Sequence, residues 1–157
     1  MSTQGRKSID AEQLRIWRNY IETAEILRAR LESRLQSDSA LSSGDYHVLL
    51  ALSEAAGRSL RSSELADSIG WERSRLSHHL GRMEKRELIR RERCADDSRG
   101  SQIVLTDTGA AAFRRGSVPH LKAIQDLFLD ALSREQLDHV EQMTESLREH
   151  LGLDAPS

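Results

Sequence analysis

The segment from residue 71 to residue 99 carries the side chains best suited to chemistry in this chain of 157 residues. It contains nine Lys or Arg and six Asp or Glu, so its net charge is +3. Residues 118–157 contain three Lys or Arg and eight Asp or Glu, so their net charge is −5. A basic middle in a chain of overall charge −2 indicates an anionic partner for the middle alone, with random surface variation as the alternative.

The sequence WERSRLSHHLGRMEKREL, residues 71–88, predicts a helix with two chemically different faces. At 100° per residue, Leu76, Leu80 and Met83 fall within about 60° of one another and face inward. The outer side and its flanks carry hydroxyl, imidazole, guanidinium and ammonium groups, on Ser74, Arg75, Ser77, His78, Arg82 and Lys85. These groups can donate to phosphate oxygens and to O6 and N7 of guanine. An ordinary solvated face is the alternative, but the only acids between residues 73 and 87 lie in the last turn.

A shorter helix is predicted just before this one, over residues 62–69, with Ser62 as its cap and Gly70 as its stop. Only Gly70, Trp71 and Glu72 join the two helices, which is the helix-turn-helix arrangement. The second helix of such a pair can lie in the major groove of DNA. We expect Ser62 to offer its hydroxyl or backbone amide to a phosphate.

Residues 88–106 predict a β-hairpin directly after the helix pair, in the position of a wing. Arginines at positions 90, 91 and 93 line its first strand, while Ile103 and Leu105 share a face of the second. At the tip, Arg99 can enter a minor groove, and the carboxylate of Asp97 can orient the guanidinium. Alone, an Asp-x-Arg pair is more often only a turn, but its place after a helix-turn-helix favours the DNA-binding interpretation.

Helical periodicity predicts four further helices around this unit. They are expected over residues 10–36, from 42 or 43 to 57, from 106 to about 131 with a bend near Pro119, and from 133 to 151. Leu60 is expected in a short extended link. The fold class is therefore mainly α with a small β-hairpin wing. Residues 1–157 form a single domain with residues 40–107 as a winged helix-turn-helix lobe.

These residues resemble the MarR family of bacterial winged helix-turn-helix transcription regulators, over residues 14–151. The first matching residues are Leu41, Ser42, Asp45, Tyr46, Val48, Leu49 and Leu52, followed by SELADSIGWERSRLSHHLGRMEKRELIRR at residues 63–91. The most specific part is the wing pattern Asp97-x-Arg99-x-x-x-Ile103-x-Leu105-Thr106-x-x-Gly109.

Two positions depart from the pattern that this resemblance carries. Many relatives have glycine where this chain has Glu87, so we expect a left-handed helix cap to be disfavoured there. Trp71 and Glu72 replace the more usual apolar residue followed by Ser or Thr. Glu72 is a poorer N-cap, although its charge suits a helix N-terminus.

The resemblance implies an obligate homodimer in which residues 10–36 and 107–152 supply the dimerisation helices. It implies a sequence-specific transcription regulator, a repressor or less often an activator, on a palindromic operator in double-stranded DNA. A winged-helix module that has left DNA for protein partners is the alternative. The expected DNA-binding residues are Ser62, Arg73, Ser74, Arg75, Ser77, His78, Arg82, Asp97 and Arg99.

The resemblance also implies that a small phenolic or otherwise lipophilic effector releases DNA in many relatives. We expect its pocket where the first, second and fifth helices meet near the dimer seam. The candidate lining residues are Trp17, Tyr20, Tyr46, His47 and Phe113. The alternative is that these rings belong to the core.

Other chemistry finds little support in the sequence. There is no glycine-rich phosphate loop and no nucleophile elbow, so we expect no enzymatic activity. His78 and His79 point about 100° apart on a helix and the other histidines are isolated in sequence, so a metal site would need long-range assembly; we expect no metal or other cofactor. Cys94 is the single cysteine, which excludes an internal disulfide, and we expect an inert thiol rather than a redox switch. No apolar run is long enough to cross a bilayer, so a cytoplasmic address without a membrane partner is expected.

Overall fold

The computed structural model describes residues 8–94 and 97–153, without the side chains of Cys94 and residues 97–99. The α-helices of this part are α1 (Ala11–Ser39), α2 (Ser43–Glu54), α3 (Ser62–Ile69), α4 (Arg73–Lys85), α5 (Asp107–Leu127) and α6 (Arg134–His150). The strands are β1 (Ser59–Arg61), β2 (Ile89–Cys94) and β3 (Asp97–Leu105). The expected fold class, mainly α with a small β wing, is confirmed.

Side-chain caps fix where most of these helices begin. Ser42 and Ser133 each accept a hydrogen bond from the backbone amide three residues on, in capping boxes; the spacing of Ser133 and Gln136 predicts the second of these. Thr106 caps α5 with its side chain alone, which accepts from the amide of Gly109. Ser62 was expected to cap α3, but it is the first residue of that helix, and Arg61 takes the N-cap position. Gly70 ends α3 at φ +69°, a conformation that glycine adopts without steric cost.

The wing contains one strand more than the sequence pattern predicts. β1 pairs antiparallel with β3, which also pairs antiparallel with β2, so the order is β1-β3-β2. Leu60 lies opposite Ile103 on β3, and Arg91 of β2 lies opposite Ile103 from the other side. The expected extended link is therefore a paired strand. Three residues are too few for an alternating pattern to reveal, and the pairing depends on contacts distant in sequence.

The buried core belongs to the winged-helix lobe. Its largest fully buried side chains come from the end of α1, the link after it, α2, α3, α4 and the sheet: Leu35, Leu41, Leu49, Leu52, Leu65, Leu76, Leu80, Met83, Ile89 and Ile103. The inward orientation predicted for the apolar stripe of α4 is confirmed. This packing holds the short helices α3 and α4 against the sheet.

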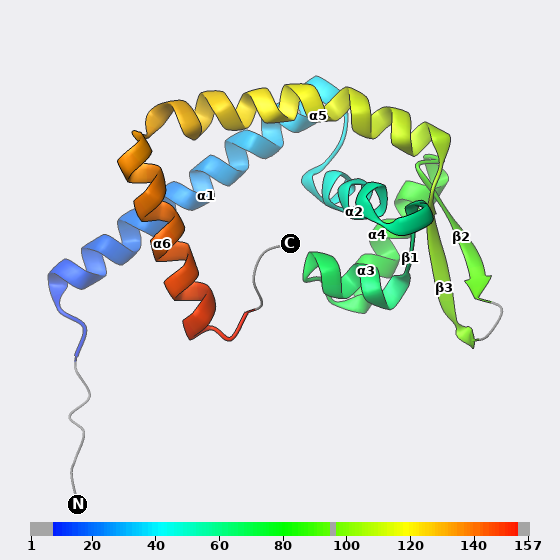
Figure 1. Ribbon diagram of the computed structural model, residues 1–157, viewed down its shortest axis with the longest axis horizontal. Helices are drawn as coiled ribbons and strands as arrows, with labels where there is room; N and C mark the ends of the chain where they lie inside the picture. The colour runs from blue at the N-terminus through cyan, green and yellow to red at the C-terminus, as the bar shows by residue number, and fades with distance from the viewer. Residues whose placement is uncertain (1–7, 95–96, 154–157) are drawn as a thin grey trace, which may run out of the picture.

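Long helices extend from the lobe to the other end of the molecule (Figure 1). α1 and α5 pack along each other, and Nη1 of Arg34 joins Oδ2 of Asp126 at 3.1 Å. α5 contains Pro119 and ends at Leu127, where a 3₁₀ turn at Leu129–Ala131 replaces the expected helical continuation. α6 then turns away from α5 and contains no buried residue.

Glu87 corrects the prediction that a left-handed cap is disfavoured after α4, because its φ is +61°. Its backbone amide donates to the carbonyl of Glu84 at 2.9 Å, and the amide of Leu88 donates to the carbonyl of Met83 at 3.1 Å. These two bonds form a Schellman motif, which satisfies carbonyls at the helix end. The motif forms despite a steric cost of about 1–2 kcal/mol for a side chain in this conformation.

Candidate nucleic-acid interface

The outer face of α4 is polar, basic and open to solvent, as the helical pattern predicts. Its exposed side chains include Arg73, Ser74, Arg75, Ser77, His78 and Arg82. At the start of the helix Glu72 makes no side-chain cap, and its Oε1 instead accepts a hydrogen bond from Oγ of Ser74 at 2.6 Å. The face therefore presents several hydrogen-bond donors that α4 holds in one register.

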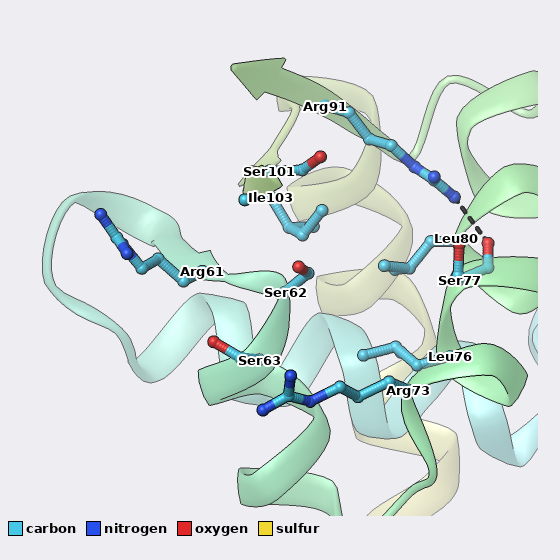
Figure 2. Close-up of a pocket in the computed structure, with 11 residues that line it drawn as sticks. Arg61, Ser62, Ser63, Arg73, Leu76, Ser77, Leu80, Arg91, Ser101 and Ile103 are labelled. Atoms are coloured by element: carbon cyan, nitrogen blue, oxygen red, sulfur yellow. Dashed lines mark hydrogen bonds between the residues drawn. The ribbon is translucent and has the colours of Figure 1, made fainter. Parts of the chain in front are cut away.

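A hollow of about 380 Å³ opens between α3, α4 and the sheet (Figure 2). Three guanidinium groups and several hydroxyl groups line it, from Arg61, Ser62, Ser63, Arg73, Ser77, Arg91 and Ser101. Among the described residues, no carboxylate lines it. A site with this charge and these donors fits an oxyanion such as a backbone phosphate of DNA.

Arg91 connects the wing to α4 across this hollow. Its Nη2 donates to the backbone carbonyl of Ser77 at 2.6 Å, a bond drawn in Figure 2, and its backbone amide donates to Glu84 at 3.1 Å. Its Nε is buried and has no hydrogen-bond partner among the described residues. Arg91 thus joins the sheet to α4, and its guanidinium still has an N–H group that can donate a hydrogen bond.

Gly81 leaves the outer groove of α4 open. This shallow groove is lined by Ser74, Ser77, His78, Gly81, Arg82, Lys85 and Arg91. A Cβ at position 81 would meet only the Nη2 atom of Arg91, at the ordinary contact distance of 3.7 Å. Packing within the described chain therefore does not require glycine there, and a ligand backbone can approach the helix closely.

Asp45 anchors a buried polar network beneath α4 that no sequence pattern predicts. Its side chain is 4% exposed and accepts from the amide of Ser42 at 3.0 Å, from Nη1 of Arg86 at 2.7 Å and from Nε2 of His79 at 2.9 Å. Nη2 of Arg86 also donates to the carbonyl of Ala40 at 3.1 Å. Burial alone would raise the pKa of Asp45, but these hydrogen bonds and the charge of Arg86 hold it well below its usual range.

His79 extends the network toward the exposed face of α4. Its Nδ1 accepts from Nη2 of Arg82 at 3.0 Å, and its ring meets the ring of Trp71 edge-on, with 5.2 Å between centroids. The guanidinium of Arg75 lies 4.0 Å above the Trp71 ring. A signal for His79 was present, because it lies three residues after Leu76 in the inward stripe.

The predicted effector residues are only partly brought together. Tyr46 is buried and contacts Phe113, with ring centroids 5.3 Å apart. Trp17 and Tyr20 are 57% and 43% exposed on α1, and His47 is also exposed. The ring of His120, which the sequence analysis did not include, lies 4.4 Å from that of Tyr46. Burial and the charge of His47 lower the pKa of His120.

At the tip of the wing the structure describes the backbone of residues 97–99 and not their side chains. The backbone of Asp97 and Arg99 belongs to β3, but the side chains of both, and of Cys94, lie outside the described residues. Within residues 8–94 and 97–153, no group of three or more His, Cys, Asp or Glu side chains is arranged to hold a metal ion. In the same part of the chain, no helix is long and apolar enough to span a membrane.

Two short helices joined by a tight turn, a basic second helix and an adjoining antiparallel sheet define a winged helix-turn-helix protein. The MarR family model matches residues 41–100, from α2 to the wing. With the solved structures below, this match shows that the chain belongs to the MarR family of transcriptional regulators.

Two similar structures come from Streptomyces coelicolor. AbsC, a MarR family transcriptional regulator, is 34% identical with a TM-score of 0.85, over 92% of this chain and 97% of AbsC. Sco3205, a MarR family regulator solved in complex with DNA, is 36% identical with a TM-score of 0.86, over 96% of this chain and 93% of Sco3205.

A more distant structure shares the fold. It is the organohalide-sensing regulator RdhR-CbdbA1625 in its 2,4-dichlorophenol-bound form, which is 21% identical with a TM-score of 0.77. The match covers 96% of this chain and 86% of that one.

Proposed function

We propose that the protein is a sequence-specific transcriptional repressor that binds a palindromic operator as a homodimer in the cytoplasm. The observation that carries this proposal is the exposed, donor-rich face of α4 beside a hollow lined by guanidinium groups. The DNA complex of the similar regulator Sco3205 supports it. Repression follows where the operator overlaps a promoter, because the bound dimer then blocks access to the duplex.

The contacts divide into two kinds according to their position. Ser74, Arg75, Ser77, His78 and Arg82 project from α4 and read base edges or phosphates in the major groove. Ser62 and Arg73 line the hollow and bind a phosphate, together with Arg61 and Arg91. Arg99 enters the adjacent minor groove and Asp97 orients it, as the wing sequence predicts.

The proposed dimer explains an apolar surface that one protomer does not cover. Its exposed side chains lie on α1, α5, α6 and the segment after α6: Leu14, Ile16, Trp17, Tyr20, Ile26, Val118, Leu121, Met143, Leu147, Leu151 and Leu153. This many exposed large apolar side chains on the helices outside the lobe supports an interface there. Two-fold symmetry would then place two α4 helices in successive major grooves, about 34 Å apart.

A small phenolic or lipophilic effector would act where α2 meets α5. The dichlorophenol complex of RdhR-CbdbA1625 supports this chemical class. Tyr46 and Phe113 provide two adjacent rings at this position, and Trp17, Tyr20 and His47 are the other candidate contacts. Binding there would shift the lobe relative to the long helices and so change the spacing of the two α4 helices.

Selection of bound fragments from random double-stranded DNA tests the proposed function. We expect a palindrome whose half-sites are about one helical turn apart. We also expect affinity for the selected site to fall steeply with salt, because bound phosphates release counterions when the complex forms. Recovery of no preferred sequence, with no binding at low salt, would reject DNA recognition and favour the protein-interaction alternative.

Arg99→Ala tests the minor-groove contact separately. We expect operator affinity to fall by about 1–3 kcal/mol at fixed salt, with the melting temperature unchanged. Arg134→Ala, whose side chain is 90% exposed on the polar side of α6, is the matched control for the loss of one cation. If Arg99→Ala and the parent protein bind the operator equally well, Arg99 does not contact the DNA.

A further inference from the structure

We propose that Asp45 and His79 are positioning residues that hold the guanidinium of Arg82 in place for DNA. Neither residue lies on the exposed face of α4, and Asp45 belongs to a different helix. The inference rests on the proposed DNA-binding function, and it assigns a role to buried groups that no base or phosphate can reach.

The chemistry of the partners decides which nitrogen of His79 carries the proton. Arg82 can only donate hydrogen bonds, so Nδ1 must offer its lone pair at 3.0 Å. The Asp45 carboxylate can only accept, so Nε2 must carry a hydrogen and donate it at 2.9 Å. Both contacts require the same neutral tautomer. By accepting from Nε2, the Asp45 carboxylate on α2 therefore keeps Nδ1 of His79 unprotonated, so that Nδ1 can accept from Arg82 on the outside of α4.

The ring of His79 has little freedom to leave this arrangement. The ring of Trp71 packs against it, nearly perpendicular to it. The backbone of α2 also lies against both rings, because a Cβ added to Gly44 would lie 2.9 Å from Cε1 of His79 and 2.8 Å from Cη2 of Trp71. Arg86 holds the second oxygen of Asp45, which fixes the plane of the carboxylate. The acceptor offered to Arg82 is thus fixed in both position and direction.

This arrangement reduces the disorder of Arg82 before DNA binds. Arg82 is exposed, and a free arginine side chain loses rotamer entropy when it is immobilised at an interface. With one Nη held by His79, the remaining N–H groups of the guanidinium stay available on the outer face. Arg75 is held differently, by stacking on Trp71, and depends on neither nitrogen of the imidazole. It therefore provides a matched control.

Asp45→Asn is the decisive variant, because it keeps the shape of the side chain and reverses the tautomer. The amide oxygen of Asn would accept from Arg86 and from the Ser42 amide, which leaves the NH₂ group facing His79. Nε2 must then accept, so the proton moves to Nδ1 and opposes the donors of Arg82. We expect the ¹⁵N shifts of the His79 ring to report an Nε2-protonated ring in the parent protein and an Nδ1-protonated ring in Asp45→Asn.

A double-mutant cycle on the selected operator measures the coupling. In the parent protein, Arg82→Ala should reduce affinity about tenfold, as expected for a lost base or phosphate contact. In the Asp45→Asn background, the same change should cost less than about twofold, because Arg82 is no longer held there. Arg75→Ala should cost the same in both backgrounds. A structural role for Asp45 alone would lower the affinity of every variant but leave the cost of Arg82→Ala unchanged.

A second variant keeps the inference testable if Asp45→Asn does not fold. His79→Phe retains the ring contact with Trp71 and removes both nitrogens, so it should suppress the cost of Arg82→Ala in the same way. An equal cost of Arg82→Ala in both backgrounds, or a proton on Nδ1 of His79 in the parent protein, would overturn the inference. Failure of the parent protein to bind any DNA would instead reject the proposed function, and the ¹⁵N measurement would still decide the tautomer.

Discussion

The winged-helix lobe and the long helices outside it both carry apolar stripes, but they differ in whether one chain buries them. In the lobe, apolar stripes of α2, α3 and α4 pack against one another and against the sheet, so side chains such as Leu49, Leu65 and Leu80 are fully buried within one chain. In α6, a stripe of equal regularity buries no residue, and Leu147 is 42% exposed. The lobe completes its own core, whereas the long helices need cover from elsewhere.

The largest expected effect comes from a charge placed on the uncovered stripe. Leu147→Asp should dissociate the proposed dimer, because an unpaired carboxylate would be buried against apolar side chains of the second copy. Operator affinity should then fall by a factor of about 100 or more, since two half-sites are no longer bound together. Sedimentation velocity measures the oligomeric state, and a DNA titration measures the affinity.

Gln142→Asp is the control for this change, because it places the same charge on the opposite, polar side of α6. It should leave both the mass in solution and the operator affinity unchanged. A parent protein that sediments as a monomer would contradict the proposed dimer directly. A dimeric Leu147→Asp variant would show that α6 lies outside the interface. Only α1 and α5 would then need cover from the second copy.

The second largest effect is expected where α5 leaves the lobe. A Cβ added to Gly109 would lie 2.0 Å from the backbone oxygen of Leu88 and 2.9 Å from Cδ1 of Leu105. Because a backbone oxygen cannot move aside independently, Gly109→Ala should lower the free energy of unfolding by about 3 kcal/mol or more. Urea denaturation followed by circular dichroism provides the measurement.

Gly81→Ala makes the same substitution in a helix with open space around it. There the added methyl group meets only Nη2 of Arg91, at 3.7 Å. We expect this variant to be more stable than the parent by about 1 kcal/mol, because alanine favours the helix over glycine. Similar stabilities for Gly81→Ala and Gly109→Ala would contradict the close packing of α5 on the lobe.

The comparison also explains which parts of the structure the sequence could reveal. Helix periodicity, the capping box at Ser133 and the stop at Gly70 are local signals, and all of them predict what the structure contains. β1 and the contact of Asp45 with His79 join residues distant in sequence, and no local pattern encodes them. The helical pattern places His79 among apolar residues, but only the fold shows which acid it meets.

Glu87 illustrates how a local rule can fail. Residue preference alone disfavours φ +61° for Glu, yet the two hydrogen bonds that close the end of α4 require that turn. The candidate DNA-binding face was predictable because it depends on the period of one helix. The hollow beside it was not, because α3, α4 and the sheet meet there from separate parts of the chain.

Glu87→Gly should produce a smaller, stabilising effect in the lobe. Glycine relieves the steric cost of the left-handed conformation, and the more flexible unfolded chain offsets part of this gain. We expect a net increase of about 0.5–1 kcal/mol in the free energy of unfolding, visible as a higher melting temperature. Lys85→Gly, two residues earlier inside the helix, should instead destabilise by about 1 kcal/mol. Two variants shifted in the same direction would contradict the Schellman motif.

The smallest effect is expected at the junction between the two regions, where His120 of α5 contacts Tyr46 of α2. Burial first, and the charge of His47 second, lower the pKa of His120 in the folded protein. The unfolded chain, with an ordinary histidine pKa of about 6.5, therefore binds this proton more readily. The contribution of His120 to stability is complete above about pH 6.5 and is lost as pH falls toward its lowered pKa in the folded protein. Asp45 makes a separate contribution to stability. Its carboxyl pKa is lowered in the folded protein, so this contribution is lost only at more acidic pH.

Denaturant titrations at a series of pH values below about 7 test this linkage. His120→Phe keeps a ring against Tyr46 and removes the ionisable group, so it should flatten the slope of unfolding free energy against pH. His47→Gln should flatten the slope less, because it removes the smaller cause and leaves the burial of His120 unchanged. Identical slopes for the parent and His120→Phe would show that protonation of this histidine does not contribute to the pH dependence of stability. A slope that His47→Gln removes completely would reverse the order of the two causes.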